Sequence, residues 1–190
     1  MLTILLLIPF IGALLVSVVP GHDSSSRSRS ITLTTLALQC LLSFGLLIPF
    51  TAAEPGQQLV DILPWLPQMG LEFSLGVDGL SLPLVLMNGV LCLVAAAASR
   101  SVENRPRVYF ALLLVISGAV NGAFLAQNLL LFFLFYELEL IPLWLLIAIW
   151  GGANRAYAST KFLIVTAVSG VLILAAFLGI ALVTGSVDFG

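Results

Sequence analysis

The chain has 190 residues, of which 61% are hydrophobic and only 8% are charged, and its formal net charge is −2. This composition excludes a soluble globular domain and indicates an integral membrane protein, because a membrane-spanning helix needs about 20 predominantly apolar residues. Cys40 and Cys92 both lie inside apolar runs, so we expect neither a disulfide framework nor a metal cluster.

Apolar runs predict six transmembrane helices, at residues 2–19, 31–50, 80–98, 108–126, 128–150 and 162–184. Residues 21–30, rich in Ser and Arg, predict a solvated loop that contains the only histidine, His22. Residues 153–160 predict a polar link before the sixth run. Residues 51–78 form the second loop, in which LEFSLGVD (71–78) alternates apolar and polar side chains and predicts a short strand at the end of the bundle.

The basic residues indicate the orientation in the membrane. All seven fall in the first, third and fifth connections of the six-helix scheme: Arg27, Arg29, Arg100, Arg105, Arg107, Arg155 and Lys161. By the positive-inside rule, we expect this side to be cytoplasmic. Adding or removing one helix would distribute these charges over both sides, so the agreement supports the count of six.

Two carboxylates, Glu137 and Glu139, lie near the middle of the fifth run. An acid at the bilayer centre costs at least about 2.5 kcal/mol, so it faces a protein interior or a wet cavity and by default marks a proton or ion path. Glu137 lies roughly 14 Å from the outer end of the run, close to the midplane. Because a helix turns 100° per residue, the two acids point about 200° apart and cannot share one proton site.

Pro142 cannot donate a hydrogen bond to the carbonyl of Leu138, which frees a polar group one turn from the acids. A freed carbonyl beside a buried carboxyl is a place for ordered water, and a proton path needs water. The alternative is that both acids are structural and hydrogen-bonded to other helices. No basic residue lies inside a predicted span, so either Glu137 is protonated at rest or its counter-charge comes from outside this chain.

The fourth run contains Gly118 and Gly122, a small-xxx-small spacing that lets helices approach closely. Asn121 beside them can form a hydrogen bond across such a contact. We interpret these three residues as helix-packing residues.

Three stretches carry a family resemblance: LPWLPQMGLEFSLGVDGLSLPLVL, FFLFYELELIP and WGGANRAYASTKF. Together they closely resemble the antiporter-like membrane subunit called chain 4 of NAD(P)H-quinone oxidoreductase, of the respiratory complex I type. The ELELIP form is most similar to the cyanobacterial and plastid members. The resemblance implies that Glu137 matches the family's essential proton-pathway glutamate. Glu139 also fits the pattern of the photosynthetic members, but no established role comes with it.

The resemblance implies an all-α polytopic membrane protein, the N-terminal part of a fourteen-helix antiporter-like fold with two inverted five-helix repeats. In that fold a lysine on the seventh helix is the partner of the fifth-helix acid. We therefore expect a fragment with two parts. Residues 1–98 would form an N-terminal three-helix segment with the outer-side loop 51–78, and residues 99–190 would form an incomplete first repeat.

The implied function is proton translocation without a redox centre in this chain, and no iron–sulfur cysteine cluster, dinucleotide fingerprint or intramembrane histidine pair is present in the sequence. Other subunits would use a quinone such as plastoquinone and NAD(P)H or ferredoxin. The expected partners are those membrane subunits and the lipid bilayer, with no nucleic acid. The implied location is a cyanobacterial thylakoid or plasma membrane. The first linker and the ELELIP region resemble the variants associated with carbon dioxide uptake, whose uptake proteins would be further partners.

Two other functions remain open. A subunit of a multi-chain cation/proton antiporter resembles the same family and needs the same buried acid, and the partner subunits would separate these two cases. The third possibility is a structural membrane scaffold without transport, in which the replacement of Glu137 by Gln should have no effect on function.

Overall fold

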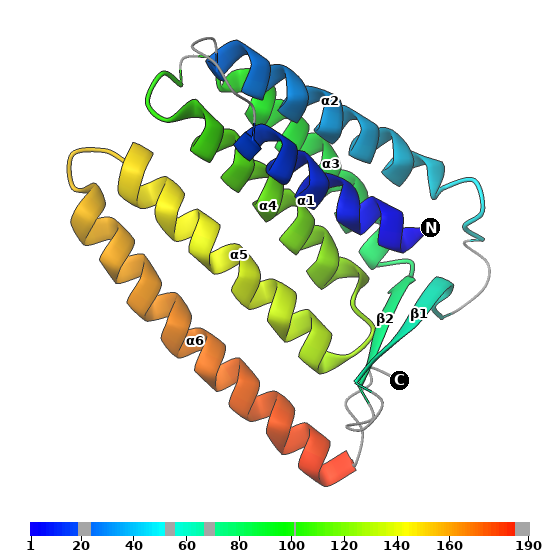
Figure 1. Ribbon diagram of the computed structural model, residues 1–190. Helices are drawn as coiled ribbons and strands as arrows, with labels where there is room; N and C mark the ends of the chain where they lie inside the picture. Colours follow the sequence, from blue (N-terminus) through cyan, green and yellow to red (C-terminus); the bar gives the residue numbers. More distant parts are fainter. Residues whose placement is uncertain (19–23, 52–55, 67–70, 101, 185–190) are drawn as a thin grey trace.

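The computed structural model describes residues 1–18, 24–51, 56–66, 71–100 and 102–184. They form six helices and two strands (Figure 1): α1 Leu2–Val18, α2 Ser24–Gly45, β1 Gln58–Leu66, β2 Leu71–Val77, α3 Ser81–Ala98, α4 Pro106–Leu125, α5 Leu129–Trp150 and α6 Arg155–Thr184. The helices lie side by side in a bundle, and the two strands cover one end of it (Figure 1).

The predicted boundaries of α3, α4, α5 and β2 are confirmed to within two residues. Local chemistry explains where these helices begin. Pro106 occupies the first turn of α4, where its missing N–H is not needed. Asp78 lies in the turn before α3, where its Oδ1 accepts hydrogen bonds from the backbone N–H groups of Leu80 at 2.9 Å and Ser81 at 2.6 Å.

The loop predicted at residues 21–30 is wrong for the part that the structure describes, because α2 begins at Ser24 and ends at Gly45. The polar residues at the start of α2 form hydrogen bonds with backbone groups near the connection between α3 and α4. The Ser25 hydroxyl donates to the carbonyl of Val102 at 3.2 Å, and the Arg29 guanidinium donates to the carbonyl of Ala97 at 3.0 Å. Hydropathy alone does not reveal such long-range bonds. His22 lies outside the described residues.

The polar link predicted at residues 153–160 is also shorter than expected, because α6 begins at Arg155. The hydroxyls of Ser159 and Thr160 both donate to the carbonyl of Ala156, at 3.1 and 2.9 Å. These bonds within the helix let polar side chains continue it.

The predicted strand at residues 71–78 is confirmed as β2, but the prediction missed its partner. β1 pairs antiparallel with β2, with Asp61 opposite Leu75 and Pro64 opposite Glu72. The pattern of β1 is hard to read in the sequence because it contains a proline and two register shifts, which disturb the alternation of the side chains.

Four of the helices in the described residues, α3 to α6, are long and apolar enough to cross a membrane. α1 is apolar but has 17 residues, and α2 is not among the helices that reach the hydropathy of a span. The prediction of six helices is therefore confirmed, whereas the prediction of six full spans is supported for four of them. α2 falls short because it starts in the Ser/Arg segment and buries polar side chains.

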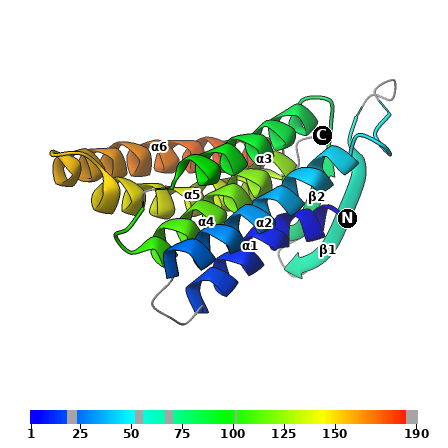
Figure 2. The same cartoon turned by 90° about the horizontal axis from the view of Figure 1, so that it is seen from above.

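α4 lies at the centre of the bundle and packs against α1, α2, α3 and α5, while α6 packs mainly against α5 (Figure 2). The predicted role of the glycines is confirmed. A Cβ at Gly118 would lie 2.8 Å from the ring of Phe10 in α1, and a Cβ at Gly122 would overlap the ring of Phe135 in α5. The small residues of α4 therefore let both neighbouring helices approach its backbone.

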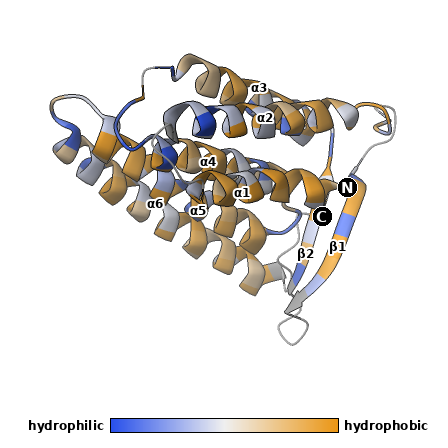
Figure 3. Ribbon diagram, turned by 45° about the horizontal axis from the view of Figure 1, so that its top comes forward, coloured by the Kyte–Doolittle hydropathy of each residue, from blue (hydrophilic) through white to orange (hydrophobic). Residues whose placement is uncertain are grey.

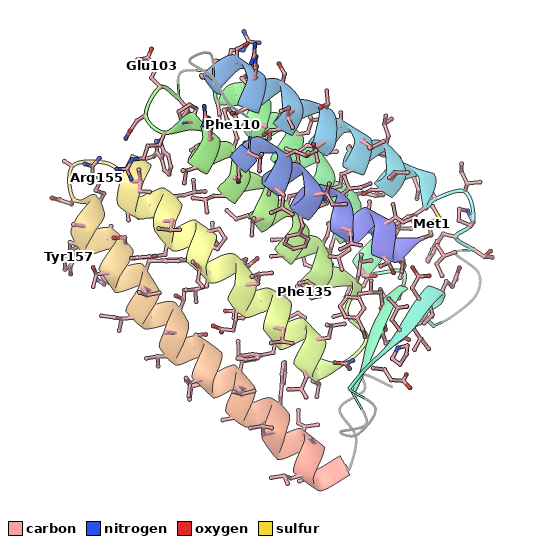
Figure 4. The ribbon with its side chains drawn as sticks, in the orientation of Figure 1. Met1, Glu103, Phe110, Phe135, Arg155 and Tyr157 are labelled. Carbon is pink, nitrogen blue, oxygen red and sulfur yellow. The ribbon has the colours of Figure 1, made fainter. Side chains whose placement is uncertain are left out.

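The basic residues gather at one end of the bundle, called the basic end below. They lie in the connections α1–α2, α3–α4 and α5–α6 or in the first two turns of the helices that follow. Figure 3 shows the hydrophilic residues concentrated in connections and helix starts, with mostly hydrophobic helix middles. Glu103, Arg155 and Tyr157 lie at the basic end, and Met1 lies at the opposite hairpin end, beside β1 and β2 (Figure 4). This common location agrees with the charge pattern of the six-helix prediction.

Candidate functional site

The turn between α4 and α5 is attached to the β-hairpin, which sets the depth of the helix that carries both acids. The backbone N–H of Gln127 donates to the carbonyl of Ser74 in β2 at 3.0 Å. Asn128 caps α5 by accepting the N–H of Leu131 at 2.8 Å, and its Nδ2 donates to the carbonyl of Glu72 at 2.8 Å. A single side chain thus joins the first turn of α5 to the sheet.

Glu137 packs against α6. Its carboxylate lies against Gly170 so closely that any Cβ at this position would overlap Oε1. That oxygen is buried and has no hydrogen-bond partner among the described residues. Leaving a buried polar atom unpaired costs about 1–3 kcal/mol, and more for a charged group. The site therefore has an unused capacity to bind a proton, a water molecule or a polar group from another part of an assembly.

Glu139 is half-buried and accepts no hydrogen bond from a described residue. It projects about 200° away from Glu137 around α5, so it does not share the Gly170 contact. That the two acids face different surroundings stays a prediction. α5 continues as a helix through the buried Pro142, whose missing N–H leaves the carbonyl of Leu138 without its helical donor.

No basic side chain of the described residues reaches Glu137. Lys161, the basic residue of α6 that is nearer to Gly170, has its Nζ 5.8 Å from the centroid of the Tyr157 ring, at the basic end. It precedes Gly170 by nine residues in α6, which corresponds to about 13 Å along the helix axis.

Between Glu137 and the hairpin end lie aromatic side chains and a cavity. The ring of Phe132 stacks on Tyr136 with centroids 6.2 Å apart and meets the edge of Phe177 in α6 at 6.0 Å. Phe132 also lines a cavity of about 270 Å³ whose polar walls include Asp78 and Gln127. Phe132 precedes Glu137 by five residues, about 7.5 Å along the axis. The cavity thus comes within two helical turns of the acid.

Sequence reasoning missed Gly170. The available signal was a lone small residue in the apolar sixth run, but its role depends on which α6 residue faces Glu137, and spacing within one helix cannot supply that. For metal binding, no three His, Cys, Asp or Glu side chains come together in the described segments.

Residues 126–190, which include Glu137 and Gly170, match a family model described as NADH:quinone oxidoreductase/Mrp antiporter, transmembrane. The chain is 43% identical to NAD(P)H-quinone oxidoreductase chain 4 2 of Thermosynechococcus vestitus, over 97% of this chain and 34% of that protein. It is 40% identical to chain 4 1 of Synechococcus elongatus, over 99% and 35%. The chain is a relative of these chain 4 subunits. It spans about a third of their length.

The fold of this relative of chain 4 occurs in solved assemblies. It matches a chain in respiratory complex I from Thermus thermophilus with a TM-score of 0.83 and 29% identity, covering 100% of this chain and 38% of that one. It matches a chain of the Mrp complex from Dietzia sp. with a TM-score of 0.82, covering 98% and 20%. At 20% identity the second match shows the fold alone. The predicted family resemblance is confirmed, and the carbon dioxide uptake variant stays a prediction.

Proposed function

We propose that the chain forms part of a proton-translocating membrane subunit of an NAD(P)H–plastoquinone oxidoreductase of the complex I type, with no redox centre of its own. Glu137 is the group that binds and releases the proton. The observation that carries the proposal is the buried Oε1 of Glu137, which has no hydrogen-bond partner among the described residues and lies in the middle of a helix apolar enough to cross a membrane. The identity of 43% to a chain 4 subunit supports the class of complex.

The physical basis is the sensitivity of a buried carboxyl to distant charge. Two unit charges 4 Å apart interact by about 1 kcal/mol in water but by about 4 kcal/mol at an effective dielectric constant of 20. Since 1.4 kcal/mol corresponds to a tenfold change in an equilibrium constant, interactions of this size can couple a change of charge elsewhere in the complex to proton binding by an acid inside the membrane. Electron transfer in other subunits would act through such a change of charge.

Gly170 gives the acid its position in this mechanism. Without a side chain at Gly170, the carboxylate of Glu137 reaches the backbone of α6 instead of being held off by a methyl group. The cavity lined by Phe132 and Asp78 lies at the hairpin end, between the start of α5 and the adjacent ends of α3 and α4. Glu139, which faces away from Gly170, is a secondary candidate for the same path.

The test uses Glu137→Gln in the assembled complex, because Gln keeps the size of the side chain but does not titrate. The proton uptake of vesicles, normalised to electron transfer, should fall at least tenfold, while assembly stays nearly intact because a neutral amide is easier to bury than a carboxylate. Glu139→Gln should do less, and Glu103→Gln, which changes an exposed acid at the basic end, is the matched control. An assembled Glu137→Gln complex that pumps at the wild-type ratio would refute the proposal.

A second candidate is a subunit of a multi-chain cation/proton antiporter, which the matching family model favours because its description includes the Mrp antiporter. The two functions differ in the partner subunits that are expected to assemble with the chain. Copurification with quinone-reducing subunits supports the first, and sodium-dependent proton exchange without quinone reduction supports the second. Copurification with carbonic-anhydrase-like uptake proteins would support the carbon dioxide uptake variant.

A further inference from the structure

A cluster of polar side chains lies buried on the side of α4 that packs against α2 and α3. Its members, called the amide cluster, are Gln39, Asn88, Ser117 and Asn121, with exposures of 0%, 7%, 0% and 0%. Nε2 of Gln39 donates to Oγ of Ser117 at 2.9 Å, and Nδ2 of Asn88 donates to Oδ1 of Asn121 at 2.7 Å. The cluster is distinct from the Glu137 site, because α5 packs on a different side of α4, at Gly122.

The hydrogen bonds determine which way the amides of Asn88 and Asn121 point, whereas both amide atoms of Gln39 contact the Ser117 hydroxyl. Nδ2 of Asn88 lies 3.0 Å from the backbone carbonyl of Ser117, which can only accept, so this atom must be the nitrogen. Its other hydrogen goes to Asn121, which must therefore present its oxygen to Asn88. The thiol of Cys92 donates to Oδ1 of Asn88 at 3.3 Å and supports the same orientation.

This orientation leaves Nδ2 of Asn121 without a partner. The atom is buried, and no described group accepts its hydrogens. An unpaired donor of this kind costs about 1–3 kcal/mol, so the site calls for an acceptor. A metal ion is excluded because the free atom is a donor, and an anion is excluded because the amide cluster contains no positive charge. No side chain of another protein reaches a residue that is 0% exposed between three helices.

We infer that the amide cluster binds an ordered water molecule that accepts a hydrogen bond from Nδ2 of Asn121. Water can donate in turn to the remaining lone pairs of the Gln39 and Asn88 oxygens, which makes three hydrogen bonds of the kind a buried water forms.

Radiolytic footprinting of the assembled complex tests the inference, because hydroxyl radicals formed from a bound water oxidise the nearest buried sulfur. Cys92, bonded to the cluster and 8% exposed, should be oxidised several-fold faster than Cys40, which is 9% exposed and whose sulfur has no hydrogen bond with a described residue. Asn121→Leu should abolish the difference and leave the ratio of protons to electrons unchanged.

Equal oxidation rates of Cys92 and Cys40 in the wild-type complex would overturn the water site. This comparison is made without any variant, so it does not depend on whether a variant folds. If Cys92 is oxidised faster than Cys40 and Asn121→Leu does not lower its oxidation rate, the water does not lie at Asn121. A lower proton ratio in an assembled Asn121→Leu complex would overturn the separation of the water site from the proton path. None of these outcomes depends on Glu137, so the water site and the proposed function can fail independently.

Discussion

Replacing Gly170 by Ala tests whether the α5–α6 contact holds the proton-binding group in place. The new Cβ would overlap the carboxylate of Glu137, whereas an ordinary van der Waals contact needs about 3.4 Å. Either the carboxylate turns away from α6 or the two helices separate, because the backbone of α6 cannot yield by itself. Gly179 lies in the same helix, and a Cβ there meets nothing within 4 Å. Gly179→Ala is therefore the matched control.

The expected size of the effect follows from this geometry. Restoring normal contact requires a displacement of roughly 1 Å, and a misplacement of that order costs up to about 100-fold in a reaction that depends on position. Overpacking in a well-packed contact also costs about 1–3 kcal/mol of stability. Gly179→Ala should be neutral or slightly stabilising, since Ala exceeds Gly in helix propensity by up to about 1 kcal/mol.

The assay is proton uptake in vesicles of the purified complex, normalised to quinone reduction, with assembly measured in parallel. Gly170→Ala should lower the ratio of protons to electrons by tenfold or more, and adding Glu137→Asp, which shortens the acid by one methylene, should restore part of it. An assembled Gly170→Ala complex with the wild-type ratio would refute the reasoning. So would a loss of the same size in Gly179→Ala.

Three further predictions concern the hairpin end and the orientation. Asp61 accepts hydrogen bonds from the Met1 amino group at 2.7 Å and from Thr3, and although burial raises its pKa, these bonds and the positive charge outweigh it and lower the pKa below 3.8. Asp61→Asn should therefore lower the free energy of opening of the hairpin by about 1 kcal/mol at neutral pH, measured by hydrogen exchange of β1. The difference from wild type should shrink as the pH falls below 3.8, because Asp61 then becomes protonated and loses its charge. A pH-independent difference would contradict this prediction. Asn128→Ala removes the cap of α5 and the link to β2 and should cost about 1 kcal/mol, seen as a lower Tm; an unchanged Tm would show that the cap is dispensable. Cysteines at the exposed positions Glu103 and Tyr157 should react with an impermeant reagent only from the cytoplasmic side, and labelling from the opposite side would overturn the orientation.

The sequence by itself determined the class of protein, the helices that carry the site and the main candidate residue. Long apolar runs and their caps locate α3, α4 and α5 to within two residues, because these signals are local. The clustering of basic residues predicts which connections share one end. Glu137 stands out because an acid in an apolar run is costly wherever it points.

Only the tertiary structure decided what surrounds these residues. The contact of Glu137 with Gly170 joins positions 33 residues apart on two helices, and the bond of Asn88 to Asn121 joins positions 33 apart on two others. The helical start of α2 likewise depends on Arg29 reaching Ala97, and β1 depends on its pairing with β2. A side-chain pattern records which face of a helix is polar, but the identity of the opposite residue depends on helix rotation and depth. Those are set by packing of the whole bundle, so the unpaired oxygen of Glu137 and the unpaired nitrogen of Asn121 emerge only from the fold.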